Sequence, residues 1–151
     1  MTDESFPRKY NPSDFGLSER LFRGFRKNDL DKESGEILAN SVRFPDFSCN
    51  WERFSAPEDV KRRNNGLETD GCYAFTVEVS RYKDMATPCH DPNPKNDPDN
   101  YAHVEVRQLD KGESVLKAPP HGRPKMWSKS MRFEYRQNIV YNLERLIEPM
   151  A

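Results

Sequence analysis

Two segments of the chain alternate between apolar and polar side chains, and this pattern constrains the fold more than any other feature. The apolar positions of the first segment, residues 72–82, are Tyr73, Phe75, Val77 and Val79. Those of the second segment, residues 101–109, are Ala102, Val104 and Val106. Successive side chains of a strand point to opposite faces of its sheet, so a period of two indicates a strand with one buried face. The chain is therefore predicted to contain a β-sheet with an apolar face.

Two weaker patterns predict further strands. Within residues 17–27, apolar side chains mixed with arginines suit either a short helix from Ser18 or a strand with a bulge at Gly24, and the strand is favoured. Residues 37–44 alternate loosely and are predicted to form another strand, which ends before Pro45 because proline cannot donate a ladder hydrogen bond. By contrast, residues 83–100 contain four prolines and are predicted to be one long loop without regular structure.

Two helices are predicted from capping and periodicity. Ser55 and Glu58, three residues apart, match a capping box, and Pro57 is tolerated in a first turn, which together predict a helix over residues 56–63. Near the C-terminus, apolar residues recur at helical spacing at Ile139, Val140, Leu143, Leu146 and Ile147. This stripe, which Pro149 ends, predicts an amphipathic helix that packs on the sheet.

These elements together predict an α+β fold with a small antiparallel or mixed sheet of about four strands. The C-terminal amphipathic helix is expected to cover one face of that sheet. Residues 1–16 are predicted to form an N-terminal arm held by its aromatic side chains. Residues 17–151 are predicted to form a single domain, because a chain of 151 residues suits one hydrophobic core.

Composition argues against several classes of function. Leu, Ile, Val and Phe make up roughly a fifth of the residues, so the core must be thin. The 24 basic and 25 acidic residues nearly cancel, which leaves no overall attraction to nucleic acid or to an anionic membrane. Three widely spaced cysteines suit a reducing compartment, and no apolar run could span a bilayer, so a cytoplasmic protein with no membrane partner is expected. The glycine-rich turn of a nucleotide site and the nucleophile elbow of a serine hydrolase are both missing from the sequence.

Residue types that bind metals gather around the second alternating segment. His90 and Asp91 belong to the long loop, and His103 and Glu105 lie on one face of the predicted strand. A loop that doubles back would bring the four together around a divalent metal, as in a metal-dependent hydrolase or nuclease. The alternative is a solvated sheet face on which these side chains pair across strands. Cys89 is disfavoured as a nucleophile, because side chains of adjacent residues rarely point at each other.

Two aromatic regions are candidates for binding surfaces. Phe47, Trp51 and Phe54 would form an exposed edge for a protein partner, or would instead supply the core that the few aliphatic residues leave thin. Residues 121–136 combine basic and aromatic side chains, as single-stranded nucleic-acid binding does. The candidates for that contact are Arg123, Lys125, Trp127, Lys129 and Arg132. The alternative is that the aromatic side chains anchor the start of the C-terminal helix.

Three short motifs within residues 21–106 resemble those of a loose group of small bacterial proteins. The motifs are Phe-x-Asp-x-Ser at Phe44, Asp46 and Ser48, Ser-x-Pro-Glu at Ser55, Pro57 and Glu58, and Ala-His at Ala102 and His103. The resemblance implies a bacterial origin and transfers no activity, cofactor or catalytic residue. If the histidine is a fixed part of the pattern, His103 gains weight as a functional position.

The leading hypothesis from the sequence is a non-enzymatic accessory module that binds a protein partner through the aromatic segment or the long loop. It is favoured because each catalytic pattern considered above is incomplete, whereas binding needs only a surface. No cofactor is expected under this hypothesis. The first alternative is the metal-dependent hydrolase or nuclease, and the second is nucleic-acid binding through residues 121–136.

Overall fold

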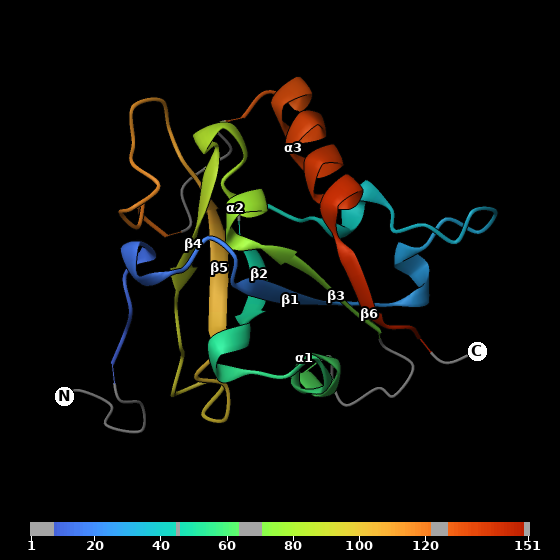
Figure 1. Ribbon diagram of the computed structural model, residues 1–151, viewed down its shortest axis with the longest axis horizontal. Helices are drawn as coiled ribbons and strands as arrows, with labels where there is room; N and C mark the ends of the chain where they lie inside the picture. Colours follow the sequence, from blue (N-terminus) through green and yellow to red (C-terminus); the bar gives the residue numbers. More distant parts are fainter. Residues whose placement is uncertain (1–7, 45, 64–70, 122–126, 150–151) are drawn as a thin grey trace.

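The computed structural model describes residues 8–44, 46–63, 71–121 and 127–149, and these residues form an antiparallel sheet of six strands (Figure 1). The strands are β1 (Arg20–Phe25), β2 (Asp46–Trp51), β3 (Gly71–Thr76), β4 (Ala86–His90), β5 (His103–Gln108) and β6 (Glu144–Ile147). They lie in the order β4-β5-β2-β1-β3-β6. The predicted α+β class is confirmed, and of the two predicted arrangements, antiparallel or mixed, the sheet is antiparallel, but the prediction of about four strands is wrong.

Helices lie on both sides of the sheet in the described part of the chain. They are α1 (Pro57–Arg63), α2 (Val77–Ser80) and α3 (Lys129–Asn142), with short 3-10 helices η1 (Pro12–Asp14), η2 (Lys27–Asp29), η3 (Ala39–Ser41), η4 (Glu52–Phe54) and η5 (Tyr82–Asp84). Figure 1 shows α2 and α3 on one face of the sheet, called here the inner face, and α1 on the opposite, outer face. Within the described ranges, no helix is both long and apolar enough to cross a membrane.

The inner face carries the main hydrophobic core, and aromatic rings make up much of it. Phe47 and Phe75 stack with their centroids 5.5 Å apart, and Phe15 of the N-terminal segment stacks on Trp51 at 3.9 Å. From α3, Tyr135 and Ile139 are fully buried against the same cluster. Because each aromatic side chain buries a large area, the rings compensate for the shortage of aliphatic residues.

The outer face is apolar on one half and polar on the other. On the β1–β3 half, Phe22, Cys72 and Ala74 pack against Val60 of α1. On the β2–β5 half, the outward side chains are Ser48, Asn50, His103, Glu105 and Arg107. Strand β5 therefore contributes valines to the inner face and polar or charged side chains to the outer face.

Two of the local predictions hold, with different details. Residues 20–25 are a strand, but Gly24 pairs with Cys72 in regular register rather than forming a bulge. Helix α1 begins at Pro57, and the backbone N–H of Ala56 donates to the Asp59 carboxylate at 2.9 Å. Ser55 instead accepts a hydrogen bond from the Asn50 side chain. The expected helix end near residues 64–66 lies outside the described residues.

The first alternating segment is a strand only as far as Thr76. The hydroxyl of Thr76 accepts a hydrogen bond from the backbone N–H of Val79 at 3.2 Å, which caps helix α2. Val77 is fully buried and Val79 packs against the same core. The prediction of strand over residues 77–82 is wrong because a capped helical turn buries Val77 and packs Val79 on the core without a further strand partner.

The predicted strand at residues 37–44 is also wrong. Ile37 and Val42 are buried there, but the backbone between them forms η3, and the Ser41 hydroxyl lies 3.1 Å from the Tyr73 hydroxyl. The neighbouring strand is β2, whose alternate side chains Phe47, Cys49 and Trp51 all face the core. The period of two at these three positions is the sequence signal for this strand. It was missed because only the aromatic residues were considered, and their spacing of three and four does not alternate.

Two further corrections concern elements at the edges of the sheet. The predicted loop 83–100 contains β4, and Pro88 is tolerated there because β4 is an edge strand with one unpaired side. The C-terminal helix ends at Asn142, after which β6 pairs with β3. Leu146 and Ile147 pack on the outer-face cluster from that strand rather than from a helical stripe.

Candidate functional site

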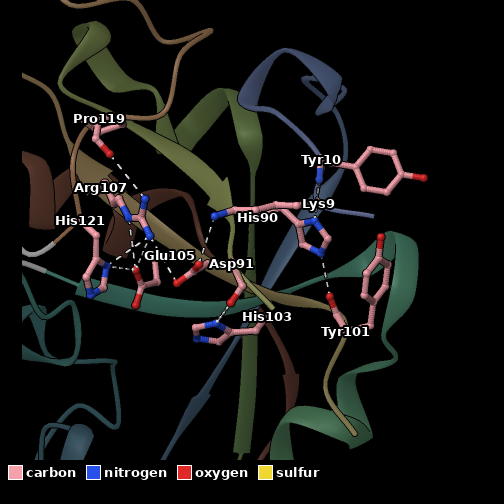
Figure 2. A network of polar contacts seen from close by, with 10 residues as sticks. All are labelled: Lys9, Tyr10, His90, Asp91, Tyr101, His103, Glu105, Arg107, Pro119 and His121. Atoms are coloured by element: carbon pink, nitrogen blue, oxygen red, sulfur yellow. Dashed lines mark hydrogen bonds and ion pairs between the residues drawn. The ribbon is translucent and has the colours of Figure 1, made fainter. Parts of the chain in front are cut away.

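The metal-type residues of the sequence meet only in part, on the outer face of β4 and β5 (Figure 2). Asp91 follows β4, Glu105 lies on β5, and His121 comes from the segment that follows β5. One ligand-type atom of each lies within 4.8 Å of the others. His90 and His103 do not belong to this group. His121, which the sequence did not single out as a metal-type residue, takes their place.

Arg107 lies at the centre of this group. Its Nη2 atom is 2.9 Å from Glu105 Oε1, 3.3 Å from Asp91 Oδ2 and 3.2 Å from His121 Nδ1. His121 Nδ1 is in turn 2.9 Å from Glu105 Oε1, so it donates to the carboxylate in one tautomer and accepts from Arg107 in the other. One guanidinium nitrogen thus contacts all three atoms that could hold a metal.

The Glu105–Arg107 pair is withdrawn from solvent, with 9% and 8% of the two side chains exposed. Burial lowers the pKa of Arg107, but the hydrogen bond from Arg107 to Glu105 and the nearby acidic groups outweigh it, so its pKa is raised overall. The segment after β5 covers the pair: Arg107 donates to the Pro119 carbonyl at 3.5 Å, and the Thr87 hydroxyl donates to the Val115 carbonyl at 2.6 Å. This face is therefore not the solvated one that the alternative hypothesis described.

Burial also determines the state of the cysteine beside this pair. Cys89 lies opposite Glu105 in the β4–β5 register and is 1% exposed. Burial is the largest cause that raises the pKa of its thiol, to about 11. A protonated, inaccessible thiol is a poor nucleophile, in agreement with the prediction from the sequence.

His90 has a structural environment. Its Nδ1 accepts a hydrogen bond from the backbone N–H of Tyr10 at 3.0 Å, and its Nε2 donates to the carbonyl of Tyr101 at 2.7 Å. Burial lowers the pKa of this imidazole, which agrees with a neutral ring. Figure 2 shows the ring turned toward Tyr10 and Tyr101 and away from Arg107. His90 joins the N-terminal segment to the sheet and has no nitrogen left for a metal.

His103 is oriented differently from His90. Its Nδ1 lies 2.8 Å from the backbone carbonyl of Asp91, and a carbonyl only accepts, so Nδ1 carries the proton and Nε2 has the lone pair. The side chain lines a cavity of about 380 Å³ on the outer face, together with Ser48, Asn50 and Asn100. The late histidine of the sequence motif thus lies in a polar cavity.

The predicted aromatic edge is mostly core. Phe47 and Trp51 are fully buried, whereas Phe54 is 39% exposed and contacts the rings of Tyr10 and Tyr101. Phe47 and Trp51 therefore belong to the core, as the alternative interpretation expected. Phe54 remains partly available at the surface.

The predicted nucleic-acid surface is only partly described. Arg123 and Lys125 lie outside the described residues. Trp127 is 4% exposed and packs on Phe44 with their ring centroids 4.8 Å apart, and Arg132 donates to its carbonyl at 2.8 Å. Lys129 is exposed in the first turn of α3. The Trp127 ring therefore anchors the helix and is not presented for stacking on a base.

An aromatic surface on α3 was not predicted. Phe133 and Tyr141 are 62% and 81% exposed, the largest exposed fractions among the aromatic side chains of the described residues. They lie eight residues apart, so they share one side of a helix of about 3.6 residues per turn. Tyr135 and Ile139 occupy the opposite, buried side. The available signal was two stripes in residues 129–142, Phe133 with Tyr141 and Tyr135 with Ile139, but the expectation of a longer helix with an aliphatic stripe hid it.

The α3 surface, defined as Tyr82, Phe133, Gln137, Asn138 and Tyr141, borders a shallow cavity of about 550 Å³. Tyr82 is held beside α3 by its hydroxyl, which donates to Glu134 at 2.6 Å, and Lys83 pairs with the same carboxylate at 2.7 Å. The turn that places them contains two non-glycine residues in the left-handed region, Lys83 at φ 49° and Asp84 at φ 57°. Such backbone is uncommon and requires support from its surroundings.

Comparisons of the chain with protein-family models, curated proteins and solved structures found no match. The assignment of function therefore depends on the chain's own residues.

Proposed function

We propose that this protein is a non-enzymatic accessory module that binds a protein partner through the α3 surface. The observation that supports this most directly is the exposure of Phe133 and Tyr141 on one side of a helix whose other side forms the core. Exposed aromatic side chains in a group mark interaction surfaces, because rings of this type dominate the binding energy of interfaces.

The surroundings of these rings suit an interface. The amides of Gln137 and Asn138 lie beside them, and the ion pair between Lys83 and Glu134 lies at the edge. An apolar centre with a polar rim is the usual composition of a transient interface. The cavity between Tyr82 and the two exposed rings would accept an aliphatic or aromatic side chain of the partner.

A metal-dependent hydrolase has less support. A metal held by Asp91, Glu105 and His121 would take the position of the Arg107 guanidinium, which already balances the buried carboxylate. His90 uses both ring nitrogens in hydrogen bonds to backbone groups. Displacement of Arg107 would leave its charge without a buried partner, which is costly.

Nucleic-acid binding also has less support. Stacking on bases needs exposed rings beside basic side chains. The ring of Trp127 is buried, and the exposed rings of α3 lie beside amides and the Glu134 carboxylate. Because Glu134 is paired with Lys83, this ion pair adds no net positive charge that would attract the phosphate backbone.

Site-specific photo-crosslinking tests the proposal. A benzophenone amino acid replaces Gln137, at the centre of the α3 surface, and a second variant carries it at Leu116, which is 52% exposed elsewhere. Cells of the source organism are irradiated and adducts are identified by mass spectrometry. A protein adduct is expected at position 137 and not at 116.

The matched variant is Phe133→Ser with Tyr141→Ser, which should abolish the adduct at position 137 while the protein stays folded. An adduct that persists in this double variant, or equal adducts at positions 137 and 116, contradicts the proposal. If the adduct joins two copies of the chain, sedimentation velocity of the purified protein determines whether the partner is a second copy.

A further inference from the structure

The cavity of about 380 Å³ on the outer face lies over β1, β2 and β5 and has a volume in the range of small-molecule sites. Phe22 and Gly24 of β1 lie at its base, and Val60 of α1 forms one wall. Gly24, which has no side chain, lines the cavity with its backbone. The backbone pairing of β1 with β3 on both sides of Gly24 keeps this base fixed.

The imidazole of His103 presents an oriented hydrogen-bond acceptor to the cavity. Its Nδ1–H is used by the Asp91 carbonyl, which leaves the lone pair on Nε2. Among the residues that the structure describes, no group donates to Nε2. Strand β5 and the backbone of residue 91 both fix the ring, so a ligand would meet it without a loss of side-chain entropy.

Two other polar groups of the cavity have no hydrogen-bond partner within the described ranges: the Ser48 hydroxyl and the side-chain oxygen of Asn100. The amide nitrogen of Asn100 donates to Asn50 at 2.9 Å, which fixes the orientation of both amides. Asn50 and Asn100 are 4% and 6% exposed, so their arrangement is part of the fold. Together with His103, these groups match the donors and acceptors of hydroxyl groups.

The lining of the cavity also contains charged residues, the arginines Arg23, Arg26 and Arg43 and the aspartates Asp29 and Asp97. Arg43 is 70% exposed, and its only close charge partner among the described residues is Asp29, at 3.9 Å. The other oxygen of Asp29, Oδ2, accepts the backbone N–H of Arg26 at 3.0 Å. The long contact between Arg43 and Asp29 leaves the Arg43 guanidinium only loosely held. A guanidinium held this loosely is available to an anion, for which its planar donors are well suited.

From this arrangement we infer that the cavity binds a small hydroxylated anion. Arg43 binds the anionic group, a phosphate or a carboxylate, and His103 Nε2 accepts a hydrogen bond from a hydroxyl group of the same molecule. Ser48 and Asn100 bind neighbouring hydroxyls. The site is separate from the α3 surface, which lies on the other side of the sheet, so the inference does not depend on the proposed protein partner (Figure 1).

Isothermal titration calorimetry with four probes tests the inference: glucose 6-phosphate, gluconate, glucose and inorganic phosphate, each up to about 10 mM. At least one of the two hydroxylated anions is expected to bind about tenfold more tightly than both glucose and phosphate, because two sets of contacts add. Whichever of glucose 6-phosphate and gluconate binds more tightly shows whether the site prefers a phosphate or a carboxylate.

Two variants separate binding from folding. His103→Asn keeps a donor in the place of Nδ1 for the Asp91 carbonyl but removes the Nε2 acceptor, and Arg43→Ala removes an exposed charge. Each should weaken the stronger probe about tenfold or more at an unchanged melting temperature. Lys111→Ala, which removes one exposed charge in a turn that does not line the cavity, should leave binding unchanged.

The inference is overturned if none of the four probes binds the wild-type protein. It is also overturned if the hydroxylated anions bind no more tightly than glucose or phosphate, or if Arg43→Ala binds like the wild type. Because Arg43 is exposed, its variant still tests the inference if His103→Asn fails to fold.

Discussion

Strand β5 separates two kinds of interior. On the inner face, Val104 and Val106 pack among aromatic rings, whereas on the outer face Glu105 and Arg107 are almost as well buried in a polar network. The apolar face gains stability in proportion to the area removed from water, without regard to direction. The polar face is stable only as a complete set, because a buried charge without its partner keeps its full desolvation cost.

This difference bears on function. Packing of the inner face explains where α3 lies, and so which of its aromatic side chains remain exposed. The polar network explains how the segment after β5 and the residue after β4 are held on the sheet, since both contact Arg107. His103 is positioned by the same stretch of chain, through the Asp91 carbonyl.

The largest effect is expected from Arg107→Met, which leaves the buried Glu105 carboxylate without its partner. The free energy of unfolding should fall by about 3–5 kcal/mol, as measured by urea denaturation at pH 7. If Arg107→Met instead lowered the free energy of unfolding by no more than a surface substitution does, this face of the sheet would be solvated.

The control replaces both members of the pair, Glu105→Leu with Arg107→Met. Its free energy of unfolding should lie within about 1 kcal/mol of the wild type, since no buried charge remains. On the inner face, no second substitution is expected to rescue Trp51→Ala in this way, because the lost ring leaves a cavity.

A smaller effect on the free energy of unfolding is expected from the titration of His90, which makes the stability depend on pH. Its folded-state pKa lies below the ordinary value of 6.5, so the neutral ring is favoured by folding. The stability that follows is complete above pH 6.5 and is lost as the pH falls from there through the lowered folded-state pKa. Urea denaturation at pH values from 8 down to 5, in steps of about one pH unit, measures this loss of stability.

The comparison protein is His90→Gln, which has no titrating ring at this position. It should be less stable at pH 8 by about 1–3 kcal/mol, because one of two backbone groups loses its partner, and its stability should change less with pH. A variant that keeps the full pH dependence of the wild type would assign the effect to other groups.

A still smaller effect on stability is expected at the α3 surface. Phe133→Ser and Tyr141→Ser should each change the free energy of unfolding by no more than about 0.5 kcal/mol, since both rings are largely exposed. Thermal and urea denaturation measure it. A loss as large as that of a core residue would mean that these rings are structural, which would remove their main support as a binding surface.

The smallest effect is expected from metal ions. Addition of zinc at about a tenfold molar excess should leave the melting temperature of the wild type unchanged, because Arg107 holds the three ligand-type groups. Elemental analysis of protein purified without chelator should likewise give well under one equivalent of metal. A stabilised protein with one bound zinc would instead favour the hydrolase alternative.

Local patterns were sufficient for some elements and misleading for others. The alternation in β5 and the proline near the start of α1 act within a few residues, so both elements could be predicted. Strand β4 could not, because Pro88 is acceptable only at the edge of a sheet, and the order of strands is a tertiary property. The end of α3 at Asn142 likewise depends on the pairing of β6 with β3.

The candidate sites show the same limit. The sequence indicated His90 and His103 equally, but the partners that separate them are the backbone groups of Tyr10, Tyr101 and Asp91, all distant in sequence or across a turn. It gave no reason to join His121 to Glu105, sixteen residues away. Burial of Phe47 and Trp51, and exposure of Phe133, follow from which helix covers which face.

The sequence by itself determined that this chain combines a sheet with helices, because period-two alternation and helix-start residues act through local backbone geometry. It also placed His103 and Glu105 on one face of a strand. Only the tertiary structure decided that Arg107 neutralises Glu105, that His103 faces a cavity and that α3 exposes two aromatic rings. Those outcomes depend on contacts between distant segments, whose energies are set by burial and pairing that no local pattern encodes.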